Sequence, residues 1–173
     1  MQAGLVLIAR CIMLGALAVA WASVPAVAVT GGGGGPPAAP STDHYGKGKA
    51  AFEREDWQGV IEHMSRAIEE RPWHDDAYNL MGFAYRKLGD YDRALDAYDD
   101  ALKLNPHHRG ALEYLGEAYL ELDQPELAEG MLERLEVECK RILAGAGTWQ
   151  SDCEEWQDLH EAYEAYFSGR PRD

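Results

Sequence analysis

The sequence predicts an all-α fold, built from three helix-turn-helix units in a row and a closing helix. Three glycines, Gly48, Gly82 and Gly116, recur at equal intervals along the chain. Within each unit the apolar residues follow helical spacing in two blocks, which a short turn separates. Residues 41–173 contain no strand pattern. Self-similarity at a fixed period of this length is typical of stacked helix pairs.

The three units are expected at residues 41–74, 75–108 and 109–142. Their helices are predicted at 43–54, 57–70, 75–88, 91–104, 109–121 and 125–142. A residue before proline avoids the helical region, so Arg71-Pro72 and Asn105-Pro106 end the second helices of the first two units. Small residues are expected where two helices approach closely, at Gly82, Gly116, Ala94 and Ala128.

Residues 143–173 are predicted to form a hinge and a capping helix. The hinge is expected at Gly145-Ala146-Gly147, and the helix at 151–168. Ser151 or Asp152 is expected to cap the start of this helix. A wide apolar stripe follows helical spacing along it and can cover the last unit: Trp156, Leu159, Tyr163, Tyr166 and Phe167.

The second unit resembles a tetratricopeptide repeat at all eight signature positions: Tyr78, Met81, Gly82, Tyr85, Ala94, Tyr98, Ala101 and Pro106. The third unit matches less completely, with Lys140 in place of the proline, and the first unit is looser. The resemblance covers 41–142 and implies a short right-handed solenoid. It also implies a concave groove, lined by the first helices, that binds a partner. By repeat position the groove residues are Tyr45, Lys49, Phe52, Glu53, Asn79, Phe83, Arg86, Lys87, Glu113, Glu117, Leu120 and Glu121.

The two halves of this groove differ in chemistry. Tyr45, Phe52 and Phe83 are candidate aromatic anchors, since exposed aromatic residues are frequent binding hot spots. The alternative is that Phe52 and Phe83 pack against neighbouring helices. Three glutamates follow at i, i+4 and i+8 on one helix face and are interpreted as a seat for Lys or Arg of a partner: Glu113, Glu117 and Glu121. The alternative for this row is a solvated face.

The charge balance narrows the class of partner. The formal net charge is −14, and residues 1–28 carry only Arg10, which leaves 15 basic against 30 acidic residues in the rest of the chain. Nucleic-acid binders and proteins that dock on anionic membranes need a basic surface, so both classes are excluded. We expect another protein as the partner, bound through a basic or mixed-charge segment.

The start of the chain suggests export. Residues 11–22 form an apolar run after Arg10, followed by small residues, which predicts a signal peptide at 1–28 cut after Ala28, or alternatively after Ala22. Residues 29–40 are rich in Gly and Pro and are expected to be a disordered linker. The protein is then periplasmic or secreted. The alternative is an uncleaved anchor that tethers a structural or assembly factor to the membrane.

Removal of Cys11 with the signal leaves Cys139 and Cys153. An even pair in an exported chain favours a disulfide, and the alternative is two free thiols. This pair lies between the last repeat and its capping helix. A bridge there would join the two segments.

The sequence gives no support for catalysis, a cofactor or a small-molecule substrate. It contains no Gly-rich phosphate loop after a strand and no CxxC spacing. Histidines and acids at equivalent repeat ends raise a metal hypothesis: His74, Asp75, Asp76, His107 and His108. We expect successive repeat ends to lie too far apart to share one ion, so no metal site is predicted.

Overall fold

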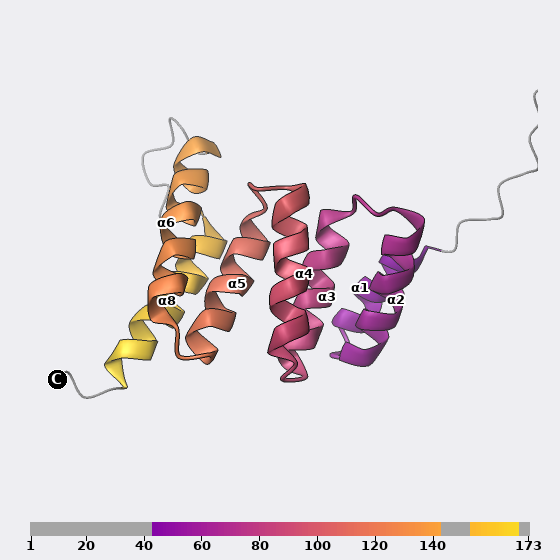
Figure 1. Cartoon of the computed structure of the whole chain (residues 1–173), viewed down its shortest axis with the longest axis horizontal. Helices are drawn as coiled ribbons and strands as arrows, with labels where there is room; N and C mark the ends of the chain where they lie inside the picture. The colour runs from indigo at the N-terminus through magenta and orange to yellow at the C-terminus, as the bar shows by residue number, and fades with distance from the viewer. Residues whose placement is uncertain (1–42, 143–152, 170–173) are drawn as a thin grey trace, which may run out of the picture. The chain divides into compact units, whose positions relative to one another are not determined.

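The computed structural model describes residues 43–142 and 153–169, all within one compact unit, Pro40–Asp173. These residues form helices and no strands (Figure 1), which confirms the all-α fold. The helices are α1 (His44–Phe52), α2 (Trp57–Glu70), α3 (Asp75–Lys87), α4 (Tyr91–Leu104), α5 (Arg109–Glu121), α6 (Pro125–Ile142) and α8 (Glu154–Ser168). The expected signal segment 1–28, linker 29–40 and hinge 145–147 lie outside the described residues.

The helices stack in pairs along the chain. α1 packs on α2, α3 on α4 and α5 on α6, and α2 and α4 each contact the first helix of the next pair. The first helices also contact one another, α1 with α3 and α3 with α5, so they line one face of the stack. α8 packs on both α5 and α6 and closes the end of the array (Figure 1).

The turns inside the three pairs share one backbone feature. Glu55, Gly89 and Asp123 occupy equivalent repeat positions and have φ angles of 56°, 77° and 63°. This left-handed conformation suits glycine, and only the second turn has one. The first helix, expected to reach residue 54, ends at Phe52 because the Glu55 N–H already bonds the Phe52 carbonyl at 2.9 Å in the tight turn.

Two of the repeat glycines allow close helix contacts. A Cβ atom on Gly82 would lie 2.7 Å from the ring of Tyr98, which is fully buried. A Cβ atom on Gly116 would lie 2.5 Å from the side chain of Leu159 on α8. Glycine at these positions therefore lets α3 approach α4 and lets α5 approach α8.

α8 begins later than the sequence indicated. Cys153 is its N-cap residue, with an extended backbone (φ −118°, ψ 92°), so the expected cap at Ser151 or Asp152 is wrong. Leu159 is fully buried against the core of the last two pairs, and Trp156, Tyr163 and Tyr166 pack around it. Phe167, the last member of the expected stripe, is 40% exposed.

A disulfide joins α6 to the start of α8. It links Cys139 and Cys153, whose Cα atoms are 5.9 Å apart and whose side chains are fully buried. The bridge therefore ties the capping helix to the last repeat. Among the described helices, none is both long enough and apolar enough to cross a membrane.

Candidate functional site

The first helices carry a row of aromatic side chains. The ring centroid of Phe52 on α1 lies 4.9 Å from that of Phe83 on α3, and Phe83 lies 4.8 Å from Tyr114 on α5. Trp57, the first residue of α2, lies 5.6 Å from both phenylalanine rings. We call these four residues the aromatic row. All are half-buried, so each ring packs on its neighbours and keeps part of its surface open to solvent.

A surface hollow opens beside the aromatic row. Its volume is about 620 Å³, and it is lined by Phe52, Glu53, Glu55, Trp57, Phe83 and Lys87. The exposed Lys87 ammonium lies 5.0 Å from the centre of the Phe83 ring, a cation–π distance. This end of the face thus combines apolar ring surface with one positive and two negative side chains.

Tyr45 lies at the other end of α1 and does not join the aromatic row. Its ring centroid is 4.3 Å from that of His74, and the Lys49 ammonium lies 5.9 Å from the centre of the Tyr45 ring. Burial raises the pKa of the Tyr45 hydroxyl, and the carboxylates of Asp76 and Asp75 raise it further. Of the three expected anchors, Phe52 and Phe83 therefore lie together and Tyr45 lies apart from them.

Arg86, which the sequence places in the groove, does not offer a free charge to a partner. It is only 5% exposed, and its guanidinium lies 2.5 Å from the Glu117 carboxylate and 3.6 Å from that of Glu121. The same guanidinium lies 5.1 Å from the Phe83 ring centre and 5.6 Å from that of Tyr114. Arg86 therefore contacts both the aromatic row and the glutamates of α5 inside the protein.

The three glutamates of α5 differ in their surroundings. Glu117 is half-buried and paired with Arg86, and Glu121 is exposed at the end of the helix. Glu113 is buried, 7% exposed, so the three glutamates do not form a uniformly exposed row. Burial is the main cause that raises the pKa of Glu113 to about 8; nearby carboxylates, first among them Glu117, contribute to this rise, and Arg86 opposes it.

Three more polar atoms are buried under this face. Within the described residues, Asn79 Oδ1, Arg86 Nε and the Tyr98 hydroxyl have no hydrogen-bond partner in the protein. Asn79, predicted as a groove residue, is only 6% exposed. Unpaired buried polar groups of this kind cost free energy in the folded protein.

The histidines and acids at the repeat ends come closer together than we expected. His74, Asp75 and Asp76 bring their ligand atoms within 4.8 Å of one another, and Asp76 Oδ1 lies 3.2 Å from His108 Nε2 of the next repeat. The Ala111 N–H donates to His108 Nδ1 at 3.2 Å, which occupies that ring nitrogen. Among the described residues His108 Nε2 has no hydrogen-bond partner, so its approach to Asp76 Oδ1 is a close contact between repeats and not a hydrogen bond.

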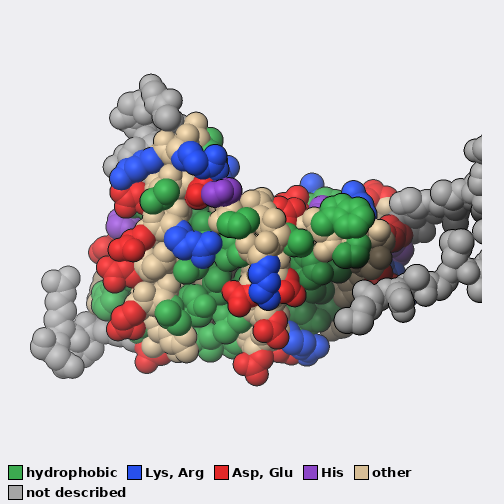
Figure 2. Space-filling view, turned by 45° about the horizontal axis from the view of Figure 1, so that its top comes forward, with side chains coloured by type: hydrophobic (Ala, Val, Ile, Leu, Met, Phe, Trp, Pro, Cys, Tyr) green, Lys and Arg blue, Asp and Glu red, His purple; other side chains and the backbone are tan. Residues whose placement is uncertain are grey.

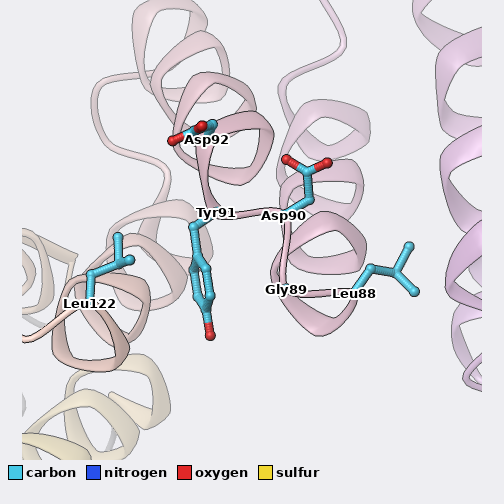
Figure 3. A pocket seen from close by; sticks show the side chains of 6 residues that line it. All are labelled: Leu88, Gly89, Asp90, Tyr91, Asp92 and Leu122. Carbon is cyan, nitrogen blue, oxygen red and sulfur yellow. The ribbon is translucent and has the colours of Figure 1, made fainter.

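A further hollow of about 480 Å³ lies at the rim, where the turn of the second pair meets the end of α5 (Figure 3). Figure 3 shows Tyr91 extending between Leu122 and the turn. Burial raises the pKa of the Tyr91 hydroxyl, and the carboxylate of Glu121 raises it further. The Tyr91 hydroxyl at the rim therefore lies close to Glu121, the last of the three glutamates of α5.

The excess of acidic over basic residues is larger in the second half of the repeat region and its cap than in the first half. Residues 41–108 contain 14 acidic and 9 basic residues, and residues 109–173 contain 16 acidic and 6 basic residues. On the face drawn in Figure 2, acidic side chains gather at the end formed by α6 and α8, with basic ones at the C-terminal turn of α6. The negative potential is therefore strongest around the last pair and its cap.

Comparison with known proteins identifies one of the helix pairs. Residues 75–108, which contain α3 and α4, match the family model of the tetratricopeptide repeat. This helix pair is a tetratricopeptide repeat. The chain is 34% identical to the anaphase-promoting complex subunit cut9 of Schizosaccharomyces pombe, over 56% of this chain and 16% of that relative. The chain therefore spans only a small part of the length of this curated relative.

Two solved structures have a similar fold. The TPR2B domain of yeast Sti1, in its complex with pHsp70, has a TM-score of 0.62 at 16% identity and covers 73% of this chain and 95% of its own. PcrH, in complex with the chaperone binding region of PopD, has a TM-score of 0.60 at 14% identity and covers 74% and 91%. At these identities the likeness concerns the fold.

Sequence reasoning missed several residues that the structure brings next to the first helices: Trp57, Tyr114, Glu155 and Asp158. A signal for Tyr114 was present. Phe52 and Phe83 are separated by the same interval as Phe83 and Tyr114, because facing residues on successive first helices are offset by about one helical turn from the repeat period. No repeat spacing relates α8 to α5, so Glu155 and Asp158 had no such signal.

Proposed function

We propose that the protein is an interaction module, which holds an extended peptide or a helix of a partner protein against the face formed by α1, α3 and α5. Its function is binding without catalysis. The aromatic row is the single observation that carries this proposal. It crosses all three repeats, and its rings keep exposed surface beside a hollow of about 620 Å³.

The energetics of the face favour a bound segment. Aromatic rings held rigidly by their neighbours supply contact area at a low cost in side-chain entropy. The complexes of two proteins with similar folds, Sti1 with pHsp70 and PcrH with a region of PopD, support the same use of the fold.

The charge of the protein favours a basic or mixed-charge segment. The acidic excess near α5 and α8 attracts cations over a distance of about a Debye length, about 8 Å at physiological salt. Lys87 at the opposite end of the face can meet an acidic side chain. A partner segment with a basic end and an apolar centre fits this order.

We further propose that the protein acts after export, with residues 1–28 removed as a signal peptide. The apolar run and the small residues before Val29 support this. The alternative is an assembly factor held at the membrane by the uncleaved segment. Mass spectrometry of the protein from its native source separates the two, because an exported form starts near Val29 and an anchored form keeps residues 1–28.

A random-peptide display selection on the purified protein tests the binding proposal. Wild type should enrich a related set of peptides, and Phe83→Ala should bind them at least tenfold more weakly. Phe83→Leu keeps an apolar side chain of similar size and should retain partial binding. Phe167→Ala removes an exposed aromatic ring of α8 and is the matched control, so it should leave binding unchanged.

Two results would contradict the proposal. Either wild type enriches no peptide, or Phe83→Ala binds the enriched peptides as well as wild type while circular dichroism shows that it is folded. If Phe83→Ala fails to fold, Phe83→Leu and Lys87→Ala on the exposed rim decide the question in its place.

A further inference from the structure

One side of α6 departs from the pattern of the repeat. We call the side that carries Leu127, Gly130 and Val137 the outer side of α6. Val137 is 62% exposed and Leu127 is 49% exposed. At the equivalent positions of α4, one repeat earlier, stand the exposed and charged Lys103 and Arg93. The exposed apolar side chains are therefore a feature of α6, and the repeat fold does not require them.

Gly130 leaves open space in the middle of this outer side. A Cβ atom on Gly130 would meet nothing within 4 Å, so this glycine, unlike Gly82 and Gly116, admits no neighbour in the described part of the chain. Glycine inside a helix weakens the helix relative to alanine. Val137 follows after about two helical turns, at a position that differs by only about 20° around the helix axis. An exposed valine in line with an uncovered glycine fits a helix that approaches from outside.

The exposed charges of α6 are divided along its length. The second half ends in the basic Lys140 and Arg141. Lys140 pairs with Glu136 and Arg141 pairs with Glu138, and 52% and 54% of these two basic side chains stay exposed. The first half carries three exposed glutamates: Glu126, Glu129 and Glu133. An antiparallel copy of the same helix would bring the acidic half of each beside the basic half of the other, which is electrostatically complementary.

We propose that the outer side of α6 binds α6 of a second copy of this chain, with the two helices antiparallel. Val137 of each copy then fills the space over Gly130 of the other. The two-fold axis passes between Glu133 and Arg134, which lie midway between these positions and carry opposite charges. A two-fold contact requires a patch that is complementary to itself, and this side of α6 meets that requirement in both shape and charge.

A hollow beside Val137 offers the second copy further apolar surface. Its volume is about 270 Å³, and Pro106, Leu112 and Val137 supply its apolar wall. The Arg134 guanidinium donates to the Pro106 carbonyl at 3.3 Å, which holds this side chain towards the loop before α5. In the antiparallel arrangement Leu127 of the second copy lies near the C-terminal turn of α6 and next to this hollow.

The dimer leaves the face of α1, α3 and α5 open. α6 supplies no residue to the aromatic row or to the hollow beside that row, so this inference does not depend on the proposed binding function. A contact between two single helices buries less than the area of about 1,600 Å² that a standard interface has. We therefore expect a weak dimer, with a Kd of about 10 to 100 µM.

Sedimentation velocity of the purified full chain tests self-association. Wild type should change from monomer to dimer between about 5 µM and about 500 µM, the range around this Kd. Val137→Lys should weaken association at least tenfold, because it would place an ammonium group in an apolar contact. Leu88→Lys makes the same kind of change at a leucine that is 50% exposed at the end of α3, so it is the matched control and should associate as wild type does.

Gly130→Leu separates the contact from the stability of the monomer. Leucine favours a helix more than glycine does and meets open space in the monomer, so the variant should resist urea at low concentration at least as well as wild type. In the dimer the added side chain would collide with Val137 of the second copy. Association should therefore fall at least tenfold.

Carbodiimide cross-linking of an equal mixture of ¹⁴N-labelled and ¹⁵N-labelled protein shows which residues meet. Links between copies should join Lys140 to Glu126 or Glu129. The proposal is overturned if wild type stays monomeric up to about 500 µM, which would leave the outer side of α6 to a different protein. It is also overturned if Val137→Lys and Gly130→Leu associate as wild type does, or if Lys140 forms links only within one copy.

The two proposals fail separately. If Phe83→Ala loses peptide binding while wild type stays monomeric, the groove stands and the dimer fails. If Val137→Lys abolishes a dimer while no peptide is enriched, the dimer stands and the interaction module fails.

Discussion

Arg86 of α3 and Glu117 of α5, on successive first helices, bring their guanidinium and carboxylate groups to 2.5 Å in a largely buried position. Phe52 with Phe83, and Phe83 with Tyr114, are separated by the same interval along the chain. Contacts between successive first helices therefore follow one offset along the groove. Arg86 and Glu117 follow the same offset and form an ion pair. We expect this ion pair to stabilise the protein.

Replacement of Arg86 by Met should destabilise the protein by about 3 kcal/mol, because it leaves the half-buried Glu117 without its counterion. The double change Arg86→Met and Glu117→Gln should recover part of this loss, since it removes both charges. Urea unfolding of the three proteins checks the prediction. Equal stability of Arg86→Met and wild type would show that the ion pair contributes nothing.

Glu113 should make the protein less stable as the pH rises. Its pKa is raised to about 8 in the folded state, above the value of about 4.3 for an unfolded chain, so the folded state holds the proton more tightly. Its contribution is fully present below the unfolded pKa and is lost as the pH rises through 8. Urea unfolding from pH 5 to pH 8.5 should show a steeper loss for wild type than for Glu113→Gln, while Glu133→Gln should behave as wild type.

Two glycine substitutions should have opposite signs. Gly89 has a φ of 77° and open space around it, so Gly89→Ala should cost about 1 kcal/mol through backbone strain alone. Gly130 lies inside α6 with open space around it, so Gly130→Ala should stabilise the protein by about 0.8 kcal/mol through helix propensity. Thermal unfolding measures both, and an effect of the same sign at the two sites would refute this account of the turn.

Loss of the disulfide should release α8 from the array. The bridge between Cys139 and Cys153 closes a loop with a sequence separation of 14, and the chain-entropy model gives roughly 3 kcal/mol for a loop of this size. The double change to serine should lower the free energy of unfolding by about that amount and increase amide exchange in α8. Unchanged exchange in α8 would mean that Leu159 and its neighbours hold the helix without the bridge.

The repeat spacing predicted the three helix pairs because each pair must bury the same faces against the next. It also placed the turns, whose left-handed residues keep the same spacing at Glu55, Gly89 and Asp123. Helix ends were less predictable, since α1 and α8 are shortened by a tight turn and by the backbone at Cys153.

The candidate site was only partly predictable. Phe52 and Phe83 were identified from their repeat positions, but the burial of Arg86 and Glu113 depends on contacts between helices. A repeat position says which face a residue occupies and not whether a neighbouring side chain covers it. The position of Asp158 could not be predicted, because α8 lies outside the repeat and the packing of α8 depends on the contact of Leu159 with Gly116.

The central claim is that the face of α1, α3 and α5 binds a partner segment. Chemical-shift mapping of a selected peptide on the ¹⁵N-labelled protein tests it most directly. The account predicts that the perturbed amides cluster on these three helices around Phe52, Phe83 and Tyr114, and extend to the start of α8. Perturbations confined to α2, α4 and α6 would contradict it.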